Sequence, residues 1–284
     1  PTRMAGLARK DGGPAVAAIA SEGRLFLNQA TDGDWNSWTE RARPAGVSVL
    51  VDIDGQKDEL YAVGGNGRLY RTRLGDAQPG QWIDFSKGPY RRVTVARDAE
   101  GVRHVFAVTS AGRIDELVQD GKDWSYAFKA PVKLPQTTPP RTMADVDAVT
   151  TTAGGIQLFG LDAGGRFWTR ATTRHHGVPS GSGNLGWSSW TAWDVRLFET
   201  NASYKSGASA KALKYTYWQE VQGPQLDGAT SITAHLMPEK AASGFLAIVV
   251  FATDARGNLY STSRRCVGPK LATCYWRGWR PFAG

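Results

Sequence analysis

The sequence predicts an all-β fold, a five-bladed β-propeller with four antiparallel strands in each blade. A Gly-Arg-Leu-Phe/Tyr motif recurs, with its glycine at Gly23, Gly67, Gly112, Gly165 and Gly257, at spacings of 44, 45, 53 and 92 residues. A cluster of aromatic residues follows each copy, and the segments between copies are short, apolar and rich in β-branched residues. A period in the forties with strand-like segments is typical of a propeller, in which each repeat forms one small sheet.

Each repeat reads as four strands in chain order. In the second repeat the expected strands cover residues 47–51, 60–63, 69–72 and 82–85, and residues 64–67 form the turn between the second and third strands. Glycine in this turn supplies the positive φ that a tight hairpin requires. The second strands are apolar without strict alternation, which is expected of strands buried on both faces.

We expect a single propeller domain over residues 1–284, with blades at about 3–45, 46–90, 91–140, 141–195 and 229–284. The 92-residue spacing leaves residues 196–228 outside this scheme, as an insertion or as a degenerate blade. Six blades are therefore the alternative to five.

Composition limits the classes of partner. The chain has 284 residues and a net charge of +8, with lysine and arginine scattered along it. No helical reading unit for a nucleic-acid groove is visible, so we expect no nucleic-acid partner. No run of 18 apolar residues occurs, so we expect no membrane span.

The cysteines point to an exported protein. Cys266 and Cys274 are the only two and lie eight positions apart, which fits a loop-closing disulfide in a secreted chain. Two unrelated thiols are the alternative. A zinc site would need two further ligands, so we expect no metal site and no cofactor.

Catalytic motifs are absent from the sequence, which contains no G-x-S-x-G elbow, P-loop or H-E-x-x-H. Asp52, Asp54, Asp145 and Asp147 lie on or beside expected first strands and could line a central channel. Glycoside hydrolysis needs two such carboxylates, so a glycoside hydrolase is one alternative. Repetition argues against a unique acid–base pair, and we predict a protein that is not an enzyme.

Residues 58–71 resemble the repeat of tachylectin-2-like five-bladed propeller lectins and, more loosely, tectonin repeats. The Trp-x-x-Trp endings are similar to those of bacterial propeller lectins and stand at Trp35/Trp38, Trp187/Trp190 and Trp276/Trp279. Two positions depart from the pattern: Asn258 replaces the motif arginine, and Asp115 replaces the motif aromatic.

The resemblance implies sugar binding in shallow pockets between neighbouring blades. Aromatic rings stack on the apolar C–H faces of sugars, and a ring of weak pockets gains by avidity on a glycosylated surface. The candidate sugar contacts are the motif arginines, the motif aromatics and the following tryptophans: Trp35, Arg68, Tyr70, Trp82, Arg113, Trp124, Arg166, Trp168, Trp187, Tyr260 and Trp276. For each tryptophan, packing of one blade on the next is the competing interpretation.

These observations predict a multivalent, secreted, carbohydrate-binding lectin, the targeting module of a secreted complex or toxin. Its expected partners are glycans or glycoproteins on a target cell surface, with other subunits of a secreted assembly as candidates. The alternative in another class is a protein–protein scaffold. It would dock a partner through the long loops expected at residues 74–81, 172–186 and 263–274.

Overall fold

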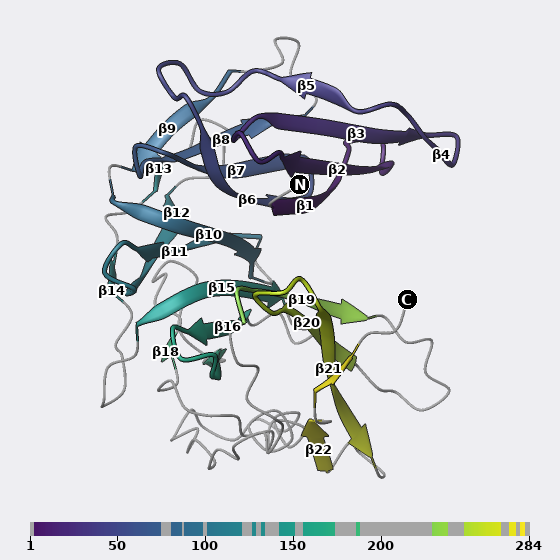
Figure 1. Cartoon of the computed structure of the whole chain (residues 1–284), viewed down its shortest axis with the longest axis vertical. Coiled ribbons are helices and arrows are strands. Elements are labelled where there is room, and N and C mark those ends of the chain that lie inside the picture. Colours follow the sequence, from purple (N-terminus) through teal and green to yellow (C-terminus); the bar gives the residue numbers. More distant parts are fainter. Residues whose placement is uncertain are drawn as a thin grey trace, which may run out of the picture. The chain divides into compact units, whose positions relative to one another are not determined.

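The computed structural model describes the chain at residues 3–74, 81–86, 88–98, 101–120, 127–128, 132–133, 142–150, 156–173, 186–187, 229–237, 247–267, 273–276 and 279–281. Its strands form five antiparallel sheets, in agreement with the predicted number of blades (Figure 1). The residues between 195 and 229 lie outside this description, so the choice between an insertion and a sixth blade stays a prediction. No helix in the described part is long and apolar enough to cross a membrane.

The chain separates into two compact units, one formed by residues 1–97 and 101–134 and the other by residues 98–100 and 135–284. The first unit holds three sheets. Their strands are β1 (Arg3–Ala8), β2 (Pro14–Ile19), β3 (Leu25–Thr31), β4 (Asp34–Trp35) and β5 (Thr39–Arg41); β6 (Leu50–Gln56), β7 (Glu59–Gly64), β8 (Leu69–Arg73) and β9 (Ile83–Ser86); and β10 (Tyr90–Arg97), β11 (Arg103–Thr109), β12 (Ile114–Asp120), β13 (Ala127–Phe128) and β14 (Val132–Lys133).

The second unit holds two sheets. Their strands are β15 (Met143–Thr150), β16 (Ile156–Asp162), β17 (Phe167–Thr173) and β18 (Gly186–Trp187); and β19 (Ser231–Met237), β20 (Ala247–Thr253), β21 (Leu259–Val267), β22 (Thr273–Trp276) and β23 (Arg280–Pro281). A single domain over the whole chain therefore stays a prediction.

Every sheet is a meander in which successive strands pair, as the repeat predicts, but the fourth strand is often divided. In the first, third and fifth sheets two short strands share the outer edge of the third strand. In the first sheet, β4 pairs with the end of β3 and β5 with its start. The chain leaves the ladder between them, where the Asn36 amide donates to the Gln29 carbonyl at 3.0 Å.

The recurring glycine closes the same hairpin in all five sheets. In the second sheet, the Gly67 amide donates to the Gly64 carbonyl at 2.8 Å, and the Gly64 amide donates to the Arg68 carbonyl at 3.0 Å. The five motif glycines have φ between 72° and 81°, the left-handed region that favours glycine. A type I turn followed by a left-handed residue is a common three-residue hairpin loop.

The same glycine lets the next sheet approach. The Gly23 carbonyl accepts the Leu50 amide at 3.1 Å, and the Gly67 carbonyl accepts the Tyr90 amide at 2.9 Å. A Cβ added to Gly23 would lie 2.6 Å from the Cβ of Val49. The motif therefore serves the contact between sheets as well as the turn within one.

Apolar side chains fill the spaces between neighbouring sheets of a unit. Leu25, Leu27 and Leu60 belong to one cluster between the first and second sheets. A second cluster joins the second and third sheets, and a third joins the fourth and fifth sheets in the other unit. In that last cluster the Phe167 and Trp279 ring centroids lie 4.4 Å apart, so Trp279 serves packing.

The predicted loop over residues 263–274 is mostly strand instead. Strand β21 continues to Val267 and pairs with β22, which places Cys266 directly opposite Cys274. Directly opposed residues of an antiparallel pair have Cα separations within the range that a disulfide spans. The register supports the predicted bridge, which itself stays a prediction.

Candidate functional site

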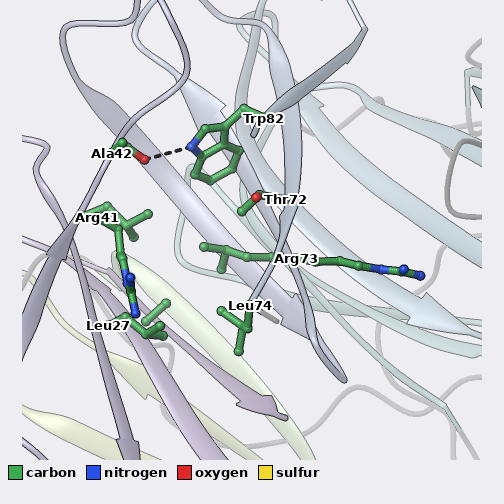
Figure 2. A pocket seen from close by; sticks show the side chains of 10 residues that line it. Leu27, Arg41, Ala42, Thr72, Arg73, Leu74 and Trp82 are labelled. Atoms are coloured by element: carbon green, nitrogen blue, oxygen red, sulfur yellow. Dashed lines mark hydrogen bonds between the residues drawn. The ribbon is translucent and has the colours of Figure 1, made fainter. Parts of the chain in front are cut away.

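A pocket lies between the first and second sheets, both within the first unit (Figure 2). Its cavity volume is about 30 Å³. Strands β2, β3 and β5 of the first sheet and strands β7 and β8 of the second, with residues directly beside β5, β8 and β9, line it. The lining residues are Ala17, Leu25, Leu27, Arg41, Ala42, Leu60, Thr72, Arg73, Leu74 and Trp82. The lining thus combines an apolar wall with one indole and two arginines.

Trp82 is the predicted sugar contact that the structure brings to this pocket. Its indole N–H donates to the carbonyl of Ala42 in the first sheet at 2.8 Å (Figure 2). The ring is half-buried and packs against the cluster that joins the two sheets. Because its one donor is already used, the ring offers a ligand only its apolar surface.

Arg41 is the polar group of the pocket and was not predicted from the sequence. It ends β5, opposite Leu25, and its guanidinium points into the pocket beside Leu27 (Figure 2). Its Nε is buried without a hydrogen-bond partner, and no ion pair to it occurs in the described part of the chain. The residues that line the pocket include no carboxylate.

Arg73 contributes its aliphatic stem to the pocket but directs its guanidinium away from it (Figure 2). That guanidinium lies 3.7 Å from Glu59 and 3.9 Å from Asp58. Glu59 is completely buried and also binds Arg103 through both carboxylate oxygens, with the Arg103 Nη2–Glu59 Oε1 pair at 2.5 Å. Arg97 lies 3.4 Å from the same carboxylate. This charged cluster holds Arg73 in place on the far side of the pocket wall.

Three predicted aromatic contacts are tied to their own hairpins. The Tyr70 hydroxyl accepts from the Asn66 side chain at 2.8 Å, and its ring is buried in the core. The Trp168 indole donates to Asp162 at 2.9 Å, and the Tyr260 hydroxyl donates to Asp254 at 3.3 Å. These bonds give the motif aromatic a structural role in the turn.

Asp254 also organises the last hairpin. Its carboxylate accepts the Arg256 amide at 2.8 Å and the Asn258 amide at 2.9 Å. The hydrogen bond from the Asn258 side chain, above all, holds the pKa of this carboxyl below its usual range. Asn258, which departs from the motif, therefore stabilises the turn that precedes it.

The departure at Asp115 also has a structural explanation. Its carboxylate accepts the Tyr90 hydroxyl at 3.2 Å within the third sheet. Burial raises the pKa of Tyr90, so this hydroxyl stays protonated and keeps donating at neutral pH.

The other predicted contacts are dispersed. Trp35 is 53% exposed on β4, and Arg68 forms an ion pair with Asp84. Arg113 and Arg166 are exposed beside their turns. The side chains of Trp124, Trp187 and Trp276 lie outside the described residues. The prediction that all eleven residues contact sugar thus stays a prediction. Among those whose side chains the structure describes, Trp82 alone lines the pocket between the first two sheets.

The aspartates that could have formed a catalytic pair hold sheets together instead. Asp52 accepts the Val93 amide at 2.7 Å and Asp54 accepts the Val95 amide at 2.7 Å, so β6 is linked to β10.

Asp145 and Asp147 repeat the arrangement in the second unit, where they accept the Ile232 amide at 3.0 Å and the Ala234 amide at 2.5 Å. Asp52 and Asp145 are buried at 3% and 2% exposure. These carboxylates accept hydrogen bonds from the backbone of the next sheet, and this structural role accounts for the repeated aspartate pair.

Comparison with known proteins identifies the fold. AofleA from Arthrobotrys oligospora, solved as an arginine-to-alanine triple mutant, matches with a TM-score of 0.58 at 11% identity, over 99% of this chain and 72% of that one. The SapL1 lectin, solved in complex with α-methyl fucoside, matches with a TM-score of 0.54 at 15% identity, over 99% of this chain and 81% of that one. The chain has the β-propeller fold. The Aleuria aurantia lectin is described as a six-bladed propeller with a novel fucose recognition mode. It matches with a TM-score of 0.53 at 13% identity, over 99% of this chain and 78% of that one.

No protein-family model and no curated protein matches the sequence. The similarity to solved structures therefore identifies a propeller whose described residues form five blades. The closer resemblance to tachylectin-2 and tectonin repeats stays a prediction. The matched solved structures share the β-propeller fold with this chain. Their sequence identity of 11–15% is too low to transfer binding residues, so these are argued from this chain alone.

Proposed function

We propose that this propeller is a carbohydrate-binding lectin that holds its glycan at the pocket between the first two blades. The observation that carries the proposal is the lining of this pocket, where the apolar surface of Trp82 and a leucine wall stand beside the guanidinium of Arg41. Sugar rings present an apolar C–H face to an aromatic side chain, and their oxygens need fixed donors such as a guanidinium.

The fold supports the same proposal. The solved propellers that match this chain include lectins solved with a fucoside or described for fucose recognition. A pocket of about 30 Å³ holds one substituent rather than a whole sugar, because a buried water alone needs ~10–15 Å³. The ring would then rest on the rim against Trp82, which gives weak single-site binding.

A glycan array with matched tryptophan variants tests the proposal. Labelled wild-type protein should bind one class of terminal sugar. Trp82→Leu keeps an apolar side chain but loses the aromatic face, so binding should weaken about three- to tenfold. Trp35→Leu alters an exposed tryptophan of the first blade, away from the pocket, and should bind like wild type.

Two results would contradict the proposal. A blank array from protein with a native circular dichroism spectrum would remove the lectin function. The pair Trp35 and Trp38, which are 53% and 47% exposed, would then mark a surface for a protein partner. A larger loss in Trp35→Leu than in Trp82→Leu would move the sugar site to that outer edge.

We further propose that the lectin acts outside the cell, recognises glycans or glycoproteins on a target cell, and serves a secreted complex or toxin. The direct opposition of Cys266 and Cys274 supports an oxidised, exported chain. The intact mass under non-reducing conditions should be lower than the mass after reduction by two hydrogen atoms. Closing this short loop should stabilise the protein by about 2–3 kcal/mol in the chain-entropy account. Two free thiols in protein purified from an oxidising compartment would remove this support.

A further inference from the structure

We propose that the pocket selects glycans that carry an acidic group, a carboxylate or a sulfate ester, and that Arg41 is the residue that determines this specificity. The inference rests on the proposed function, because it assumes that the pocket binds sugar. It goes further in naming the ligand chemistry, which differs from the neutral fucoside bound by SapL1.

The first argument is the charge state of the pocket. Three other arginines of the first two blades are balanced by carboxylates: Arg24 lies 3.0 Å from Glu22, Arg68 pairs with Asp84, and Arg73 faces Glu59. Arg43 donates to the Ser48 carbonyl instead. Arg41 has no such counterion in the described part of the chain. A guanidinium is cationic and only donates hydrogen bonds, so a bound anion would supply the missing interaction.

The second argument is the balance of donors and acceptors. The Ala42 carbonyl already accepts the Trp82 indole N–H, and the Thr72 hydroxyl uses its proton on the Gln81 carbonyl at 3.1 Å, so neither offers a free donor. The residues that line the pocket include no carboxylate that could accept a hydrogen bond from a sugar hydroxyl. A neutral hydroxyl both donates and accepts, whereas a carboxylate or sulfate only accepts. The free donor of the pocket is cationic and accepts nothing, so it matches the second kind of ligand better.

The third argument is size. A cavity of about 30 Å³ has room for two or three water-sized atoms, given the ~10–15 Å³ that one water requires. A carboxylate has three heavy atoms and fits this volume, with the sugar ring left outside on Trp82. The leucine wall lowers the local dielectric constant, which strengthens a charge-assisted hydrogen bond to Arg41.

Pairs of sugars that differ only in the acidic group test the inference. The probes are glucose with glucuronic acid, galactose with galacturonic acid and with galactose 6-sulfate, and a galactose-terminated glycan with its sialylated form. The intact chain is titrated with each at about physiological ionic strength, where exposed charges are screened within ~8 Å. Wild-type protein should bind at least one acidic member about ten- to a hundredfold more tightly than its neutral partner.

Two arginine variants of the same blade locate the effect. Arg41→Gln should lower the affinity for the acidic member about ten- to a hundredfold and the affinity for the neutral member by a smaller factor, so that the preference disappears. Arg24→Gln removes the same net charge from a side chain that is 43% exposed and already paired, and should keep the preference. Arg41→Lys should be intermediate, because it keeps the charge and loses the planar fork.

Each outcome has one meaning. Equal binding of neutral and acidic members would overturn the inference and leave the lectin proposal standing. An equal loss in Arg41→Gln and Arg24→Gln would also overturn it, since the preference would then reflect overall charge. No binding of any probe, together with a blank glycan array, would contradict the lectin proposal itself. Preference for the uronic and sialic acids or for the sulfate identifies which acidic group the pocket takes.

Discussion

At the scale of single residues, the most consequential group is the buried carboxylate of Glu59. It binds Arg103, lies within 4 Å of Arg73 and Arg97, and accepts the Tyr61 hydroxyl at 2.9 Å. Because its surroundings are dominated by guanidinium groups, its negative charge compensates several buried or half-buried cations. Its loss would leave these cations in a medium that solvates them poorly.

We therefore expect Glu59→Gln to lower the free energy of unfolding by about 3–5 kcal/mol, as is typical when one partner of a buried ion pair is removed. Glu22→Gln is the matched control. Glu22 is 71% exposed and pairs with Arg24 at 3.0 Å, so its loss should cost less than about 1 kcal/mol. Denaturant titration of both variants measures the difference. Similar small losses would mean that water reaches Glu59 and that the cluster does not stabilise the blade junction.

At the scale of elements, the recurring hairpin separates two effects of the same glycine. Gly23 and Gly257 occupy the same motif position, with φ of 72° and 81°. A Cβ at Gly23 would meet Val49, whereas a Cβ at Gly257 would have no neighbour within 4 Å among the described residues. Alanine at either position suffers the left-handed backbone penalty, and only Gly23→Ala adds a steric conflict with the next blade.

Gly257→Ala should therefore destabilise the protein by about 1–2 kcal/mol, the cost of one left-handed residue. Gly23→Ala should cost about 1–3 kcal/mol more, as in other overpacked sites. Thermal unfolding of the two variants side by side gives the comparison. Equal shifts in Tm would show that β6 moves aside freely, so that the motif glycine serves the turn alone.

The same hairpin explains which parts of the fold could be predicted. A turn with a positive-φ glycine is specified within five residues, so its five occurrences were visible in the sequence. The divided fourth strands of the first, third and fifth blades depend on where the chain leaves a ladder already formed. The extension of β21 to Val267 depends on its pairing with β22. Sequence patterns of a few residues carry little information about divided outer strands or about how far a strand extends along its partner.

The site was predicted less completely for a related reason. Trp82 was recognised because tryptophans follow every motif, but Arg41 belongs to no repeated position. It reaches the pocket through the register that sets it opposite Leu25, and at the equivalent place in the second blade Ser86 stands opposite Leu69. The links from Asp52 and Asp145 to the next blade were also missed, since they join residues 41 and 87 positions apart.

At the scale of the whole molecule, this lack of repetition bears on valency. The repeated fold predicts several sugar sites, one for each Gly-Arg motif. The pocket favours a single site, because the second blade, the one other blade in which the structure describes this position, has a serine where the first has Arg41. Of the motif arginines, Arg24 and Arg68 are already paired with carboxylates, while Arg113 and Arg166 lie exposed beside their turns.

We expect calorimetric titration with the preferred acidic monosaccharide to give about one equivalent per chain, and Arg41→Gln to abolish the measurable heat, since a charge-assisted contact contributes about 1.5–3 kcal/mol of a weak interaction. Four or five equivalents, with Arg113→Gln and Arg166→Gln each removing one, would contradict the single-site expectation. That result would assign binding to the repeated motif. A chain with one site would gain avidity on a glycosylated surface only when several copies are held together, so its stoichiometry also decides whether this propeller needs an oligomeric parent to bind tightly.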